Sequence, residues 1–306
     1  MNLSPFDIII RLILGIIIGF AIGLTGIGGG VLVIPSLNLI LGLPPSITVG
    51  TSSLYAFLTK IYAVIEHARL KNIAWKHCII FLAAAIPGCI LSAIFVSSRA
   101  AESQEFNWYL GIFIIAVISF SLVLMILNMS KQEDKKEVNK EEPVPKAEYT
   151  AQANPPSPSL TGWRLAAAIT ASIFIGAVLG ATGVGGGVLV IPTLIMLFGL
   201  STNKTVGSSI LIAIVLCLAT ALIFWIGGGT GKSQTDLPTA VIMAVGSLAG
   251  VRMGSKLSVK LPEKTLKSIV LALIAIALIS LGIKSYQSAD TVFTPETSDQ
   301  ESVESE

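Results

Sequence analysis

The chain contains nearly the same glycine-rich sequence twice, each time inside a strongly apolar stretch. "GLTGIGGGVLVIP" occupies residues 23–35 and "GATGVGGGVLVIP" occupies residues 180–192. A shift of 157 residues aligns residues 19–54 with residues 176–211 without a gap. The chain is therefore an internal duplication, and its fold must use the same glycine break in both halves.

The composition predicts a membrane protein. Of the 306 residues, 53% are hydrophobic and only 12% are charged, and the charged residues are gathered in a few segments. The apolar segments between them have the length and character of membrane spans. We expect an all-α, multi-pass integral protein of the plasma membrane or the bacterial inner membrane. Its surroundings are the lipid bilayer, and no nucleic-acid partner is expected.

The apolar residues of each half divide into five segments. As one helix, residues 4–43 would be about 60 Å long at about 1.5 Å per residue, twice the roughly 30 Å hydrocarbon core. This stretch must turn back, and its glycine cluster is the place where it can, which gives short, glycine-broken helices in each half. The expected segments are residues 4–25, 29–43, 45–66, 77–97 and 107–128, then 163–182, 186–200, 204–226, 237–257 and 264–285.

Four regions follow from this division. Residues 1–129 form an N-terminal transmembrane repeat and residues 161–286 form a C-terminal one. Residues 130–160 are charged and then rich in Pro and Ser, which is typical of a flexible soluble linker. Residues 287–306 form an acidic tail that is expected to be disordered.

Pairs of small residues four apart recur in both halves. Gly88 and Ser92 in "PGCILS" fall on Gly250 and Gly254 when this segment is aligned with "AGVRMG". Such spacing allows the backbones of two helices to approach closely. We therefore expect these four residues to lie at helix contacts.

An odd number of segments per half predicts that the second half is inverted relative to the first. With the N-terminus outside, the basic loop at residues 67–77, Arg164 and the cluster around Arg252 all fall on the cytoplasmic side, as the positive-inside rule requires. A parallel repeat of four segments would place one of the two basic clusters outside. Arg11 counts against the inverted arrangement.

The glycine breaks have two explanations. An unpaired backbone group is costly in lipid, so the breaks must face protein or a cavity. Tight helix crossing is the usual explanation of a lone glycine run. However, the amide groups that follow the break near Gly29 suit an anion, and hydroxyl residues beginning at Thr51 and Ser208 open the third segment of both halves. Capping needs only one hydroxyl, so packing and a polar anion pocket both remain open.

Charged residues restrict the chemistry further. No carboxylate lies deep in an expected span, which argues against a cation site and against paired-carboxylate catalysis. Lys60 lies near the end of its segment and is a candidate charge partner for an anion. Snorkelling to the cytoplasm or pairing with Glu66 is the favoured explanation. The histidines and cysteine of the basic loop lack ligand spacing, so neither a metal nor another cofactor is expected.

Several motifs together resemble the sulfite exporter TauE/SafE family of membrane transporters. They are the paired G-x-T-G-x-G-G-G-x-L-x-x-P signatures, "VGTSSLYAFLTK", "TVGSSI", "HARLKNIAW" and "PGCILS". The resemblance covers nearly all of the chain except the linker and the tail. It implies two homologous halves and movement of small sulfur-containing anions such as sulfite, thiosulfate and sulfonates. The family's anion pocket would fall on Thr25, Gly26, Gly28, Gly29, Gly30, Gly50, Thr51, Ser52, Ser53, Thr182, Gly183, Gly185, Gly186, Gly187, Gly207, Ser208 and Ser209.

The resulting hypothesis is a secondary transporter, specifically an exporter, that works by alternating access at the interface of two inverted halves. The alternative is a transporter or channel-like protein for another small solute, such as an amino acid or a carboxylate. That alternative needs a charged or aromatic pocket, which the sequence does not indicate. A membrane enzyme or a scaffold is the third class, and no catalytic constellation supports it.

Overall fold

The computed structural model describes residues 4–25, 30–138, 162–184, 187–200, 202–227 and 231–258, together with residues 272, 275–276, 278–283 and 285. These residues form helices joined by short connections, and the described ranges contain no strand, which confirms the all-α expectation. The first half contains α1 (Pro5–Thr25), α2 (Gly30–Ile40), α3 (Pro45–Arg69), α4 (Trp75–Glu102) and α5 (Gln104–Val138). The second half contains α6 (Trp163–Thr182), α7 (Gly187–Met196), α8 (Thr202–Ile226) and α9 (Leu237–Ser258).

Both glycine clusters divide an apolar stretch into a long helix and a short one, as predicted. α1 ends at Thr25 and α2 begins at Gly30, while α6 ends at Thr182 and α7 begins at Gly187. The short helices α2 and α7 have 11 and 10 residues. At about 1.5 Å per residue, each is only about half as long as the hydrocarbon core is thick.

The break in the second half begins with a backbone conformation that favours glycine. Gly183 follows α6 with φ of 64°, and its N–H donates to Leu179 O at 2.8 Å. A left-handed residue that closes the last turn of a helix is a common C-terminal cap, and glycine adopts it without steric cost. The chain can therefore leave the helix axis immediately after Thr182.

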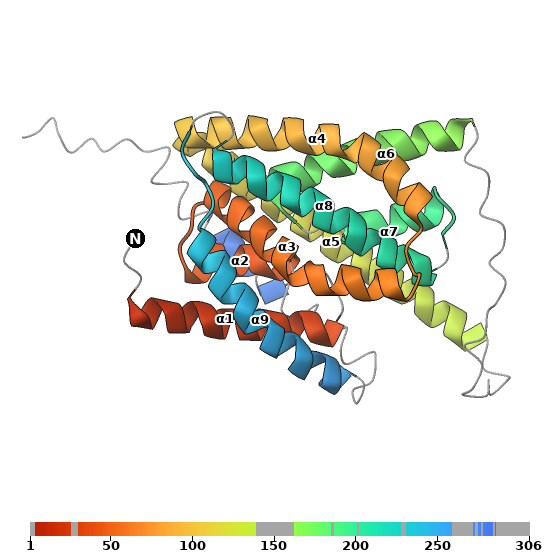
Figure 1. Cartoon of the computed structure of the whole chain (residues 1–306), viewed down its shortest axis with the longest axis horizontal. Coiled ribbons are helices and arrows are strands. Elements are labelled where there is room, and N and C mark those ends of the chain that lie inside the picture. The colour runs from red at the N-terminus through yellow and green to blue at the C-terminus, as the bar shows by residue number, and fades with distance from the viewer. Residues whose placement is uncertain are drawn as a thin grey trace, which may run out of the picture.

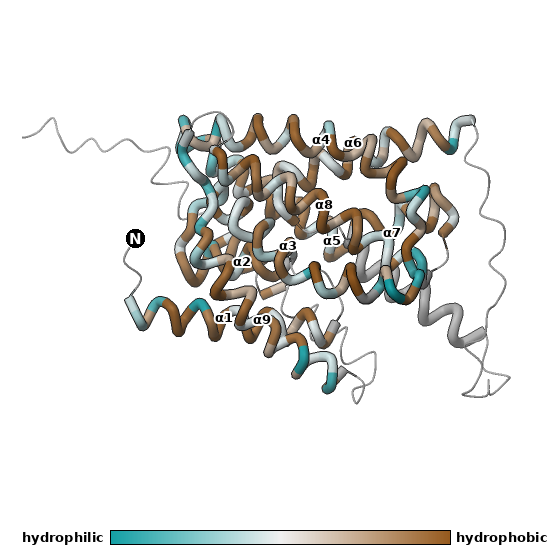
Figure 2. Tube along the Cα trace, viewed as in Figure 1, coloured by the Kyte–Doolittle hydropathy of each residue, from teal (hydrophilic) through white to brown (hydrophobic). Residues whose placement is uncertain are grey.

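Six helical segments within the described residues are long and apolar enough to cross a membrane, and Figure 2 shows apolar residues along the helices with hydrophilic ones gathered near their ends. The protein is thus a multi-pass membrane protein. The six segments are Pro5–Leu24, Trp75–Glu102, Gln104–Val123, Trp163–Thr182, Lys204–Ile226 and Leu237–Leu257.

α5 is longer than the sequence analysis expected. It continues to Val138, so residues 130–138, which were assigned to the linker, are helical. This segment is rich in Gln, Glu and Lys, which are good helix formers, and a helix already in progress extends easily through them. The remaining linker residues from 139 to 160, most of the tenth segment and the acidic tail lie outside the described residues.

Each half packs mainly against the other half rather than against itself. α1 lies along α9, α4 lies along α6, and α3 crosses α8 (Figure 1). Under the sequence repeat, α1 corresponds to α6 and α4 corresponds to α9, so the first two contacts are equivalent. α3 corresponds to α8 and thus meets its own counterpart.

The α3–α8 crossing is antiparallel. A Cβ placed on Gly50, near the start of α3, would lie 2.9 Å from Cβ of Phe224, near the end of α8. A Cβ placed on Gly207, near the start of α8, would lie 3.3 Å from Cβ of His67, near the end of α3. These two contacts are also equivalent under the 157-residue shift.

Glycines form the seams between the paired long helices. A Cβ placed on Gly19 of α1 would lie 2.5 Å from Cα of Ser247 in α9, and one placed on Gly176 of α6 would overlap the carbonyl oxygen of Ala85 in α4. Gly176 is the repeat counterpart of Gly19. Helix backbones approach this closely only where side chains are absent, and the gain is extensive van der Waals contact.

The small residues four apart lie in these seams, which confirms the predicted helix contacts. A Cβ placed on Gly88 would lie 2.6 Å from Ile173 O, and one placed on Gly250 would overlap Ile16 O, the repeat counterpart of that atom. Ser92 packs on Gly180, and Gly254 packs on the backbone of α1 at Phe20. On the outer face of α1, Ile9, Ile13 and Ile17 are exposed at helical spacing, as suits contact with lipid.

Candidate functional site

The structure brings hydroxyl groups of the first half against the glycine break of the second half. Ser52 and Ser53 of α3 are fully buried. A Cβ placed on Gly183 would lie 2.8 Å from Ser53 Oγ and 3.0 Å from Ser52 Oγ. Three residues of the predicted anion pocket, drawn from both halves, are therefore in contact. Glycine at position 183 keeps the space beside the two hydroxyls free of a side chain.

Ser52 and Ser209 occupy equivalent positions and have equivalent bonds. Ser52 Oγ donates to Val49 O at 3.1 Å, and Ser209 Oγ donates to Val206 O at 2.9 Å. Both bonds are internal to one helical turn, so each hydroxyl proton can be redirected to a ligand by rotation about a single bond. Both side chains are buried, which makes a redirected donor effective.

Thr51 and Ser208 dock one half onto the other. Thr51 Oγ1 accepts a hydrogen bond from the Asp236 N–H at 2.9 Å, just before α9 begins. Ser208 Oγ accepts the equivalent bond from the Ala74 N–H at 2.9 Å, just before α4 begins. Both hydroxyls are predicted substrate ligands, and the structure gives them a packing role as well. Each hydroxyl still has a proton to donate.

Gly50 and Gly207 both pack closely against backbone atoms of the other half. Gly50 lies against the backbone of Gln234, and Gly207 lies against the backbone of Asn72, each so closely that a Cβ would overlap a carbonyl oxygen. Tight backbone approach, one of the two explanations that the sequence left open, accounts for both glycines. Their contact with a substrate remains a prediction.

The rest of the predicted pocket is only partly described. Thr182 Oγ1 donates to Val178 O at 2.7 Å and accepts from the Val184 N–H at 3.3 Å, so this hydroxyl stabilises the turn after α6. Gly30 is buried at the start of α2. Thr25 is the last residue of α1 and Gly187 is the first residue of α7. The other predicted residues lie outside the described ranges; they are Gly26, Gly28, Gly29, Gly185 and Gly186.

The Lys60 side chain is half-buried and its ammonium group is shielded from solvent, which contradicts the favoured expectation that it snorkels, while pairing with Glu66 stays a prediction because the Glu66 side chain lies outside what the structure describes. Its Nζ is inaccessible to solvent and has no hydrogen-bond partner. Cys217 of α8, its repeat counterpart, is close enough to interact electrostatically with it. The shielding of this ammonium group depends on helix packing, and sequence hydropathy contains no information about which helix packs over which side chain.

A buried polar group that the sequence pattern does not mark lies beside Gly50. Gln234 is only 5% exposed, and its Nε2 donates to Ser97 O at 2.6 Å, which leaves Oε1 without a partner. Thr235 Oγ1, also buried and without a partner, lies next to Gly50. Both residues belong to the loop before α9, where polar residues are ordinary, so no signal in the sequence marked them.

Arg11, which counted against the inverted topology, is bound within the protein. Its Nε donates to Thr239 Oγ1 at 2.6 Å, and Thr239 Oγ1 donates to Asp236 Oδ2 at 2.7 Å. The Asp236 N–H in turn donates to Thr51. A cation tied to α9 in this way is a structural charge, whose position says little about the side of the membrane on which it lies.

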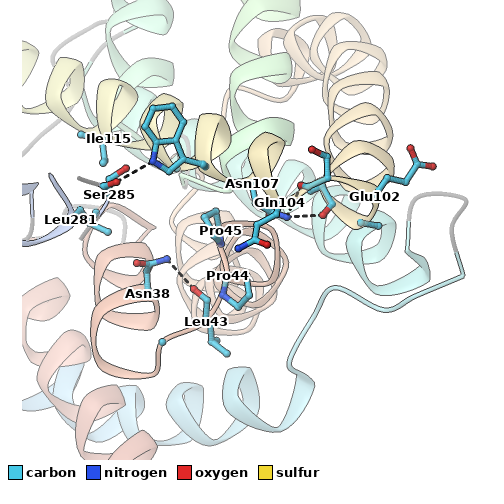
Figure 3. Close-up of a pocket in the computed structure, with 16 residues that line it drawn as sticks. Asn38, Leu43, Pro44, Pro45, Glu102, Gln104, Asn107, Ile115, Leu281 and Ser285 are labelled. Carbon is cyan, nitrogen blue, oxygen red and sulfur yellow. Dashed lines mark hydrogen bonds between the residues drawn. The ribbon is translucent and has the colours of Figure 1, made fainter. Parts of the chain in front are cut away.

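A cavity of about 600 Å³ lies between the end of α4, the start of α5 and the first turn of α3 (Figure 3). Asn38, Gln104 and Asn107 contribute polar groups to its wall. Asn38 Nδ2 donates to Leu43 O at 2.9 Å, and the Asn107 amide donates to Ala100 O at 2.6 Å. None of the predicted site residues within the described ranges lines this cavity, although Pro45 of the same helix α3 does.

Comparisons with known proteins agree with this architecture. The family model "Sulfite exporter TauE/SafE" matches residues 11–281. A "Probable membrane transporter protein YunE" of Bacillus subtilis (strain 168) is 27% identical over 291 residues, which cover 90% of this chain and 99% of the relative. A "Probable membrane transporter protein" of Haemophilus influenzae is 25% identical over 286 residues, 89% of this chain and 97% of the relative.

No solved structure matches the chain. The family match covers most of its length, and it includes both glycine breaks and both helix seams. The relatives' names and the apolar helices agree on the general activity, transport across a membrane. The chain belongs to the sulfite exporter TauE/SafE family of membrane transporters.

Proposed function

We propose that the protein is a secondary transporter, and specifically an exporter, of a small sulfur-containing oxyanion such as sulfite, thiosulfate or a sulfonate. The observation that carries the proposal is the contact of Ser52 and Ser53 with Gly183, because it joins hydroxyl donors of one repeat to the backbone break of the other. The family to which the chain belongs supports the choice of substrate class.

The chemistry of these residues suits an oxyanion. A desolvated oxyanion accepts hydrogen bonds and donates few or none, so it needs several converging O–H and N–H donors. Ser52 and Ser209 carry buried hydroxyl protons, and glycine at position 183 places no side chain between the α3 hydroxyls and the break after α6. In a site shielded from water, such neutral donors interact strongly with charge.

The proposed transport cycle alternates access between two inverted repeats. The antiparallel crossing of α3 and α8 supports this arrangement, because equivalent helices run in opposite directions there. The helix pairs α1–α9 and α4–α6 each contain one helix from each repeat. Each pair could therefore move as a unit relative to α3 and α8, which cross each other. With the N-terminus outside, the cavity beside Pro45 is at the extracytoplasmic end of α3 and serves as the outer vestibule.

The test is uptake of labelled sulfite and of labelled thiosulfate into proteoliposomes that contain the purified full-length protein. Ser52→Ala and Ser209→Ala remove one donor each, and a hydrogen bond to a charged group contributes about 1.5–3 kcal/mol. We expect each variant to weaken apparent affinity by roughly 10-fold or more, since 1.4 kcal/mol corresponds to a factor of ten.

Thr170→Ala is the matched control. Thr170 is an exposed hydroxyl residue of α6 that bonds only to carbonyls of its own helix, at Ala166 and Ala167. The Thr170→Ala variant should transport the labelled anions with the same apparent affinity as the unmodified protein. The proposal fails if neither anion is transported, or if both serine variants transport as well as Thr170→Ala. Uptake of an amino acid or a carboxylate in place of the sulfur oxyanions would establish the alternative function.

A further inference from the structure

Three buried polar atoms without hydrogen-bond partners lie along one side of α3. They are Ser53 Oγ, Lys60 Nζ and His67 Nδ1. Residues seven apart are separated by nearly two full turns, so these three side chains leave the helix in almost the same direction. From Ser53 to His67 the helix rises about 21 Å, some two thirds of the hydrocarbon thickness.

All three positions face the second repeat. Ser53 packs on Gly183 after α6. Lys60 interacts electrostatically with Cys217 of α8, and Cβ of His67 lies 3.3 Å from the position that a Cβ of Gly207 would take. The line of polar atoms therefore follows the interface between the two repeats, where a transporter of this type carries its substrate.

Lys60 lies near the middle of the α3–α8 crossing. The crossing is bounded on α3 by Gly50, which meets Phe224, and by His67, which meets Gly207. Lys60 is roughly halfway between these two contacts in sequence, and Cys217 is roughly halfway between the contacts on α8. The Cα position of Lys60 is thus in the central part of the crossing.

The repeat counterparts of these three residues are less polar. Ser53, Lys60 and His67 align in the repeat with Ile210, Cys217 and Phe224 of α8. Two of these counterparts have no hydrogen-bonding group, and a thiol is a weak acceptor. α8 carries no carboxylate, and the one carboxylate of α3 is Glu66 in its last turn. The polar line belongs to one repeat only.

A buried ammonium is retained in a membrane segment when it has a function or a partner. Lys60 repels cations and attracts anions, and Ser53 and His67 can both hydrogen-bond an anion as it passes. We propose that Ser53, Lys60 and His67 form an anion track along α3, and that Lys60 is the residue that selects for negative charge at its midpoint. This inference rests on the proposed function and extends it from a single pocket to a route.

The first experiment measures access and charge selection without using a transported substrate. In full-length protein whose three native cysteines are replaced by alanine, Ser53→Cys and His67→Cys are each treated in proteoliposomes with two methanethiosulfonate reagents, one bearing a sulfonate and one a trimethylammonium group. Ile61→Cys is the matched position, since Ile61 is exposed on the outer surface of α3. We expect the anionic reagent to label positions 53 and 67 at least 10-fold faster than position 61, and faster than the cationic reagent does.

Adding Lys60→Met should abolish this preference for the anionic reagent at positions 53 and 67, while Lys60→Arg should preserve it. Lys76→Met, which removes an exposed lysine of α4 outside the track, should leave it unchanged. Lack of labelling at both positions, or an anionic preference that survives Lys60→Met, would overturn the track.

The second experiment is sulfite and thiosulfate uptake by the same lysine variants in the native-cysteine background. Lys60→Met should lose at least 10-fold in uptake, whereas Lys60→Arg and Lys76→Met should retain it. If the unmodified protein transports neither anion but the labelling result holds, the proposed substrate class is wrong and the track stands. If the unmodified protein transports and Lys60→Met transports equally well, the track is wrong and the proposed function stands.

Discussion

Lys60 of α3 lies within electrostatic range of Cys217 of α8, the residue that occupies its own position in the second repeat. In a chain built from two copies of one sequence, residues at the centre of a crossing between equivalent helices meet their counterparts. If both residues carried a positive charge, the two charges would repel each other. If neither did, the centre of the crossing would have no charge. The pair seen here puts a single positive charge there.

Gly183 offers a direct test of the contact between the two halves. Gly183→Ala places a methyl group within 3.0 Å of the Ser52 and Ser53 hydroxyls, at a residue with φ of 64°. We expect lower apparent oxyanion affinity in proteoliposomes together with a lower Tm in detergent. The left-handed backbone alone costs an alanine about 1 kcal/mol, and the contact adds to this.

Gly162→Ala isolates the backbone contribution. Gly162 has φ of 65° and ψ of −133°, where alanine is more strained than in the left-handed conformation of Gly183 with its ψ of 5°, and a Cβ there meets no atom within 4 Å. This variant should lose stability by the backbone cost alone and should retain affinity. Equal losses of affinity in the two variants would show that contact with the hydroxyls is irrelevant to the site.

The helix seams should be intolerant of even one methyl group. Gly176→Ala forces α6 away from the carbonyl oxygen of Ala85 in α4, and overpacking of this kind costs roughly 1–3 kcal/mol. We expect a clearly lower Tm of the purified protein. Gly282→Ala, whose new Cβ meets no atom within 4 Å, should leave Tm unchanged. The seam is unimportant if the two variants unfold at the same temperature.

The two docking hydroxyls should contribute similarly to stability. Thr51→Val and Ser208→Ala each leave a backbone N–H, of Asp236 or Ala74, without its acceptor, and the loss of one such bond costs about 1 kcal/mol. Thermal unfolding should show two losses of similar size. Thr170→Ala again serves as the neutral comparison, and a loss in only one variant would mean that the two halves do not dock equivalently.

The inverted topology predicts the sides on which the connections lie. A reporter fused after the last residue should be extracytoplasmic, and one inserted at Lys71, in the exposed loop between α3 and α4, should be cytoplasmic. Alkaline phosphatase and green fluorescent protein fusions distinguish the two sides. A cytoplasmic C-terminus would refute the arrangement of five segments in each half.

Much of the fold could be predicted because its determinants are local. The length of the apolar run and the glycines between Thr25 and Gly30 required a break, and glycine or serine at a four-residue spacing required a close contact. The partners could not be predicted in the same way. The surface that Gly19 meets is the backbone at Ser247, and a small side chain does not specify which helix will pack on it.

The site was harder to predict for a related reason. Thr51 and Ser52 are neighbours with the same chemistry, yet Thr51 accepts from a backbone N–H of the other half while Ser52 donates within its own turn. Because every residue except proline has such an N–H, no pattern marks the one before α9. The shielding of the Lys60 ammonium group likewise depends on how the helices pack around α3, which emerges only when the chain folds.

The pairing of α1 with α9 has a consequence for how the chain is made. α1 leaves the ribosome before the other described helices, yet the helix that covers its glycine face begins at Leu237. At about 5–20 residues per second, that helix is synthesised roughly 10–40 s later. During this interval the glycine groove of α1 is open to lipid or to any other nascent segment. The order of synthesis therefore leaves α1 without its packing partner until α9 has been made.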